Sequence, residues 1–252
     1  MILKVVAAIL PRCFPIKKVS NFRSHFVFWV SVWIFSWGIF SGYNSYAAFE
    51  NMEIQAGVEA PWQALLGLKF DITDTLFFKG GAGLSPSFLN EGAISMTEML
   101  GAFNEDESPV AKNALASGIA FDIQVGYKWK ESIYFSTGYN FLSTSGESPS
   151  RSDINKLLNQ SLTDFDFSPG VELNTQIHSL VFHGGYIYVI SNHFVLNLEV
   201  GLIKPILAQT FMDFERASTT LPAIETQVEG ELDDSFKAMF LPTFSAWLGY
   251  RF

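Results

Sequence analysis

Three histidines lie beyond residue 47, at His178, His183 and His193, and any imidazole chemistry must use one of them. Serine hydrolases need a hydroxyl, an imidazole and an acid within hydrogen-bond reach. His178 and Ser179 are neighbours in an alternating segment, so their side chains point to opposite faces. Ser179 shares a face with His183, but four strand residues separate them by about 13 Å. We therefore expect no catalytic residues and no enzymatic activity.

The sequence shows no pattern typical of a metal-binding or cofactor-binding site. The single cysteine, Cys13, lies in a basic N-terminal segment that we expect to be removed, so the mature chain offers no thiolate ligand or disulfide. The acidic runs at Asn104–Glu107 and Glu229–Asp234 lack the spacing of an EF-hand and are better explained as solvated charge. The segment KGGAG, residues 79–83, lacks the Lys-Ser/Thr of a phosphate-binding loop. We predict no metal-binding residues and no cofactor.

Charged residues within the apolar segments all fall at polar positions of an alternating pattern. Four are acidic and five are basic: Glu53, Glu59, Lys69, Lys79, Asp122, Lys128, Glu199, Lys237 and Arg251. If the segments enclose a lumen, these charges must pair, because an isolated buried charge is strongly unfavourable. In a narrow barrel the side chains also fill the interior. We predict a salt-bridged network that plugs the lumen; the alternative is that these residues simply face water.

The elements that would position these charges are β-strands, since apolar residues recur at every second position. The clearest segment runs from Ile119 to Trp129. Eight such segments follow one another, at residues 52–60, 62–72, 76–85, 119–129, 133–141, 178–189, 194–202 and 235–252. No helical crossover pattern separates them, which favours antiparallel closure. The sequence predicts an all-β fold, an eight-stranded antiparallel up-and-down transmembrane β-barrel.

The connections between these segments are unequal in length and charge. Three are short turns, whereas residues 85–117, 143–174 and 208–234 form long loops with 17 acidic and 4 basic residues. Short periplasmic turns and long outer loops are typical of transmembrane barrels. We expect acidic extracellular loops, with short helices in ISMTEMLGAF and in SDINKLLNQSL, the latter capped by Ser152. The acidity also excludes nucleic acid as a partner.

The N-terminal segment has the pattern of an export signal. Five basic residues precede the apolar run Phe26–Phe40, and small residues follow at Ser45, Ala47 and Ala48. This order is typical of a secretory signal peptide. We predict a signal peptide at residues 1–47 and a barrel at residues 48–252, with an uncleaved membrane anchor as the alternative.

The last segment ends on alternating apolar residues at Phe244, Ala246, Leu248, Tyr250 and Phe252. This ending resembles the assembly signal of bacterial outer-membrane β-barrels, in which the final residue is commonly Phe. The whole chain resembles the small eight-stranded barrels of the OmpA/OmpX/OmpW kind, at the level of the broad superfamily. The resemblance implies a location in the bacterial outer membrane. It also implies lipid and lipopolysaccharide as surroundings, and barrel assembly machinery and periplasmic chaperones as partners during biogenesis.

We predict a structural or surface-interaction role through the acidic loops. Two other functions stay open. One is a small, porin-like transport barrel for hydrophobic compounds, as OmpW-like proteins are thought to be. The other is a lipid A-modifying enzyme, although the deacylase motif, with His and Ser one residue apart and a following Asn, is absent.

Overall fold

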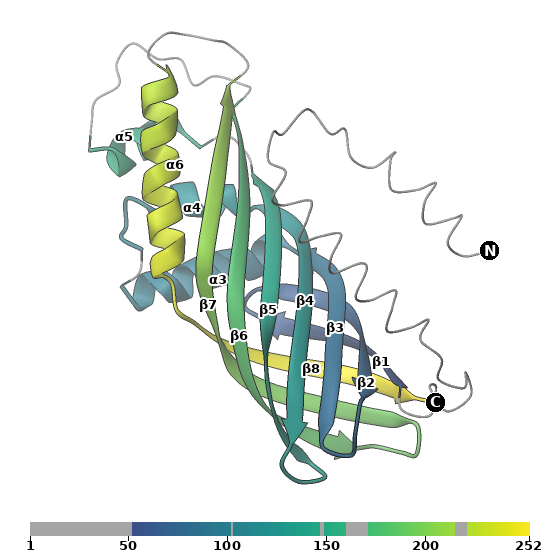
Figure 1. Ribbon diagram of the computed structural model, residues 1–252. Helices are drawn as coiled ribbons and strands as arrows, with labels where there is room; N and C mark the ends of the chain where they lie inside the picture. The colour runs from purple at the N-terminus through teal and green to yellow at the C-terminus, as the bar shows by residue number, and fades with distance from the viewer. Residues whose placement is uncertain (1–51, 102, 147–148, 160–170, 215–220) are drawn as a thin grey trace, which may run out of the picture. The chain divides into compact units, whose positions relative to one another are not determined.

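The chain forms a closed antiparallel barrel of eight strands (Figure 1). The computed structural model describes residues 52–101, 103–146, 149–159, 171–214 and 221–252. The strands are β1 (Met52–Ala60), β2 (Gln63–Asp71), β3 (Leu76–Ser85), β4 (Ser117–Lys128), β5 (Ile133–Gly146), β6 (Val171–Val189), β7 (Phe194–Phe214) and β8 (Leu241–Arg251). Each strand pairs with its sequence neighbours, and β1 pairs with β8. The predicted eight-stranded antiparallel up-and-down barrel is confirmed, whereas the predicted signal peptide lies outside the described residues.

The two ends of the barrel differ. Tight turns join β2 to β3, β4 to β5 and β6 to β7 at one end, which we call the turn end. At the other, the helix end, Pro61 and Trp62 join β1 to β2, while the remaining connections carry helices. These helices are α3 (Ser87–Met99), α4 (Ser108–Ala114), α5 (Arg151–Leu157) and α6 (Leu221–Ala238). Among the described residues, no helix is both long enough and apolar enough to cross a membrane.

Several predicted boundaries were wrong. The segment from Ser235 to Ala238 does not begin the last strand, because it belongs to α6. β6 and β7 extend well into segments that were expected to be loops, to Val171 and Phe214. The N-cap of α5 is Ser150, whose Oγ accepts from the backbone N–H of Asp153, and Ser152 lies inside the helix.

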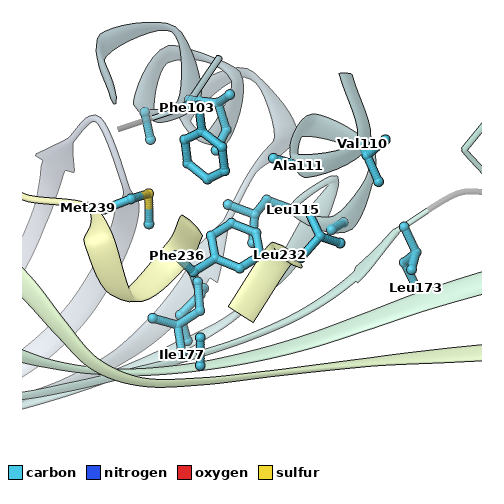
Figure 2. Close-up of a cluster of buried hydrophobic side chains, with 14 of the residues drawn as sticks. Phe103, Val110, Ala111, Leu115, Leu173, Ile177, Leu232, Phe236 and Met239 are labelled. Atoms are coloured by element: carbon cyan, nitrogen blue, oxygen red, sulfur yellow. The ribbon is translucent and has the colours of Figure 1, made fainter. Parts of the chain in front are cut away.

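The helices enclose an apolar core at the helix end, shown in Figure 2. Phe236 of α6 is fully buried and packs edge-on against Phe103, with ring centroids 5.6 Å apart. Val110 and Ala111 of α4 approach from one side, and Ile177 of β6 from the other (Figure 2). The same core continues through these side chains: Trp62, Ile94, Leu115, Leu142, Ile154, Leu173, Met212, Val228, Leu232, Met239 and Leu241. The helices and the strand ends at the helix end therefore share one packed apolar core.

The polarity of the inner and outer faces of the barrel changes along the strands. In β6, His183 is inside and Phe182 outside, whereas nearer the start of the strand Ile177 is inside and Gln176 is partly exposed on the outer face. A shift in the register between β6 and β7 lies between these two regions. The turn-end half is thus apolar outside and polar inside, while the helix-end half has an apolar inside.

The core of the helix end yields a direct test. Phe236→Ala is expected to destabilise the packed helices by about 3–5 kcal/mol, because it removes a fully buried ring and leaves a cavity. Phe240, four residues later, is half exposed, so Phe240→Ala is the matched control. Urea unfolding followed by tryptophan fluorescence measures both variants. Equal losses in the two would contradict the packing described here.

Candidate functional site

The barrel lumen holds the main concentration of buried polar groups, and Glu199 of β7 lies at its centre. Lys79 Nζ donates to both carboxylate oxygens, at 2.7 and 3.0 Å. Tyr134 Oη donates to Oε1 at 2.7 Å, and Ser245 Oγ and Trp247 Nε1 donate to Oε2 at 2.7 and 2.9 Å. These donors come from β3, β5 and β8. One carboxylate therefore joins four strands across the lumen.

A second group surrounds Glu53 of β1, nearer the turn end. Its Oε1 accepts from Gln55 at 2.6 Å and from Asn197 at 2.8 Å. Its Oε2 accepts from Arg251 Nε at 3.2 Å and lies 4.0 Å from Lys69 Nζ. Two cationic groups thus compensate this carboxylate.

Aromatic rings fill the lumen beside Lys69. Its ammonium lies 4.8 Å from the ring centroid of Phe77 and 5.3 Å from that of Tyr134. The two rings meet edge-on at 5.2 Å. Gly126 makes room for this packing, because a Cβ there would lie 2.0 Å from the Phe77 ring. Ile187 and Val195 complete this small apolar cluster.

A third polar group lies between the Glu199 network and the helix-end core. Glu59 pairs in register with Gln63, and Asp122 pairs with Asn140. Asn140 Nδ2 donates to Gln63 Oε1 at 3.0 Å, which joins the two pairs. His183 Nε2 lies 3.8 Å from Glu59 Oε1. All five side chains are buried.

The histidines have surroundings that differ from those of a hydrolase triad. His183 contacts Gln124 Oε1 at 3.3 Å and Thr243 Oγ1 at 3.2 Å. His178 is partly exposed on the outer face, where its Nδ1 hydrogen-bonds Tyr139 Oη, and Ser179 is buried on the opposite face. His193 lies in the turn before β7 and stacks on Tyr250.

Eight of the nine predicted lumen charges are on the barrel strands, and six of them are buried inside. The buried six are Glu53, Glu59, Lys69, Lys79, Asp122 and Glu199. Lys128 pairs with Asp71 near the turn end, and Arg251 is partly exposed beside Glu53. The prediction for Lys237 was wrong, since this residue lies in α6 and its ammonium pairs with Asp234 at 3.2 Å.

The residues expected to form the assembly signal lie along the outer face of β8. Phe244, Leu248 and Tyr250 are exposed, and Ala246 is partly so. Phe252 follows the strand, and its ring meets that of Tyr250 edge-on at 5.3 Å. These positions leave the outer face of β8 apolar, while their role in assembly stays a prediction.

Two carboxylates of α6 form a contact that the alternating pattern did not predict. β8 pairs with β7 only as far as Ile203, so the edge of β7 beyond this point lacks a strand partner there. Asp233 Oδ1 accepts from the backbone N–H of Thr210 at 2.7 Å, and Glu229 Oε1 from that of Met212 at 2.8 Å. Four helical residues rise about 6 Å, close to the span of two strand residues. The helix therefore covers the free edge of β7 (Figure 1).

Comparisons with known proteins give only distant similarities. No protein-family model matches the chain, and no curated protein matches it. Among solved structures, Acinetobacter baumannii CarO is 11% identical with a TM-score of 0.39, and the match covers 83% of this chain and 100% of that one. CarO2 of the same organism is 10% identical with a TM-score of 0.30, over 80% and 97%. Such low similarity carries no information about the activity of this chain.

The Lys79–Glu199 pair is expected to behave as a buried ion pair. Removing one partner, in Lys79→Met or Glu199→Leu, leaves an uncompensated buried charge and should cost about 3–5 kcal/mol of unfolding free energy. The double variant should cost clearly less than the sum of the two single losses. A double-mutant cycle by urea unfolding measures this coupling. Additive losses would show that the two groups stabilise the barrel independently.

The α6 contact should depend on pH. Burial raises the pKa of the carboxyls of Glu229 and Asp233 above their ordinary values of 4.5 and 3.8. A raised pKa in the docked state means that protonation favours docking, so this contribution is present at low pH and lost as pH rises through the raised values. Hydrogen exchange in α6, corrected for intrinsic rates, should therefore show protection that falls as pH rises above 4.5. The variant E229Q/D233N should flatten this profile; protection that grows with pH would contradict it.

Proposed function

We propose that the protein is a bacterial outer-membrane β-barrel with a closed lumen, and that its helix end serves a structural or surface-interaction role. The outer face supports the membrane location. It exposes apolar residues on successive strands, among them Ile54, Leu66, Val125, Phe182 and Val200. A lipid-facing Lys or Arg at the middle of a membrane would cost about 2–4 kcal/mol. The buried lysines of this barrel face the lumen instead.

The packing inside the barrel is the observation that carries the closed-lumen proposal. Charged and aromatic side chains meet across the turn-end half, and the apolar core of the helices covers the other half. An eight-stranded barrel has an interior just wide enough for its own side chains. The paired charges therefore hold the lumen shut to ions and solutes.

The same packing weighs against the alternative of transport for hydrophobic compounds. A hydrophobic solute in the lumen would break the hydrogen bonds that Glu199 accepts from Lys79 and Trp247 and would offer none in their place. A lipid A-modifying activity would need His178 or His183 beside a nucleophile. His178 hydrogen-bonds Tyr139. His183 does contact the hydroxyl of Thr243, but its other ring nitrogen faces the amide oxygen of Gln124 and not a carboxylate, and all three side chains are buried in the lumen.

The helix end offers the surface for an interaction. Helix α6 alone carries five acidic residues and one basic residue. Its apolar side faces the core through Val228, Leu232 and Phe236, which leaves acidic residues such as Glu231 and Asp234 exposed. Partners with a basic surface are favoured by this charge.

Conductance tests the closed lumen. The folded protein, reconstituted in a planar bilayer, should give no steady unit current, because the paired charges and the helix-end core block the axis. Slower gel mobility after boiling in detergent checks that the same sample holds a folded barrel, and flotation with liposomes checks insertion. A reproducible open channel from folded, inserted protein would overturn the proposal.

A further inference from the structure

Glu59 contrasts with Glu199 in a way that indicates a bound species. Both carboxylates are buried in the lumen. Four side chains donate hydrogen bonds to Glu199. The side-chain amide of Gln63 lies beside Glu59, but neither oxygen of Glu59 makes a hydrogen bond of ordinary distance and angle among the described residues. A buried group of this kind is costly unless something compensates it.

Two oxygen atoms of neighbouring side chains also lack hydrogen-bond partners. Asp122 Oδ2 and Asn140 Oδ1 are also buried without a hydrogen-bond partner in the described part of the chain. Asn140 is fully buried, pairs with Asp122 across β4 and β5, and reaches Gln63 at 3.0 Å, which itself pairs with Glu59. Four unpartnered oxygens thus belong to one connected group, and two of the side chains are carboxylates.

The lumen cations pair with other carboxylates, and Lys79, which also attracts Glu59 and Asp122, is shared with Glu199. Lys79 hydrogen-bonds Glu199, Lys69 and Arg251 lie at Glu53, and Lys128 pairs with Asp71. Buried water would supply hydrogen bonds but no charge.

His183 is the remaining titratable group beside Glu59, at 3.8 Å. Its ring nitrogens already contact Gln124 and Thr243. A protonated His183 would supply one positive charge, whereas Glu59 and Asp122 together carry two negative charges when ionised. When both carboxylates are ionised, a further cationic species would therefore balance the charge, whereas protonation of the carboxylates would remove the need for one.

We propose that the lumen binds one hard divalent cation, Ca²⁺ or Mg²⁺, between Glu59 and Asp122. Its ligands are the two oxygens of Glu59, Oδ2 of Asp122 and Oδ1 of Asn140, which are all oxygen donors of the kind these ions prefer. Two carboxylates balance two positive charges. Among the described residues, no three His, Cys, Asp or Glu side chains are placed to hold a metal ion together, so this site would combine two carboxylates with the amide oxygen of Asn140.

The site lies along the barrel axis between the packed core of the helix end and the Glu199 network. An ion there is enclosed on both sides, so it enters as the barrel folds. Metal content is therefore best measured on protein that has been unfolded and refolded in the presence of the chosen ion.

The test compares urea unfolding of the full-length barrel in Ca²⁺, in Mg²⁺ and in EDTA at matched ionic strength. The wild type should unfold at higher urea with its divalent ion than in EDTA, and elemental analysis should find about one bound ion per chain, as expected for one site. Glu59→Gln should remove both effects. In EDTA, Glu59→Gln should be more stable than the wild type, because it removes an uncompensated charge; with the ion this order should reverse.

Two further variants distinguish an ion at this site from an ion bound elsewhere on the barrel. Asp122→Asn should act like Glu59→Gln, since it removes the other carboxylate. Glu91→Gln changes an exposed carboxylate of α3 and should keep the wild-type response. A wild type indifferent to divalent ions, with stability that responds only to pH, would show that protons neutralise the pair and would overturn the proposal. An ion effect that survives in both lumen variants would place the ion elsewhere and would also overturn it.

Discussion

The hydrogen bonds of the buried Glu199 carboxylate hold the lumen together. A carboxylate in this position needs donors from several directions, and it receives them from Lys79, Tyr134, Ser245 and Trp247. Since these donors come from β3, β5 and β8, the interior links strands that are not neighbours in the sheet. Backbone pairing closes the barrel around its circumference, and this side-chain network braces it across the diameter.

The barrel has two halves with opposite distributions of polar residues, and the Glu199 network stabilises the half whose interior is polar. Where the outside is apolar, the inside must hold the polar groups, and a narrow lumen forces them into contact. Towards the helix end the outer face gains polar residues such as Gln176, and Ile177 inside packs on the helices instead. The boundary between the two regimes lies just above Asn140 and Ser179, where Leu142 and Ile177 occupy the next inward positions. The third polar group, around Glu59 and Asp122, belongs to this boundary.

Much of the barrel was predictable because alternation is a local signal. The period of two assigned the inner and outer faces of β1 and β4 correctly. The same signal failed at Ser235–Ala238, where Phe236 and Ala238 fit a strand as well as a helix. Ile224, Val228, Leu232 and Phe236 recur at every fourth position, which is typical of a helix with one apolar face. That longer period was the signal that could have identified α6.

The contacts inside the lumen were not predictable, because they join residues far apart in the sequence. Lys79 and Glu199 are 120 residues apart, and only barrel closure brings them together. Counting charges also did not show which charges pair with one another. Lys237 lies in α6, and the other eight predicted charges, four acidic and four basic, lie on the strands. Two of those cations, Lys69 and Arg251, lie at Glu53, so an overall balance coexists with an acidic excess at Glu59 and Asp122. The predicted lumen charges can therefore balance in sum and still leave an acidic pair where a cation could bind.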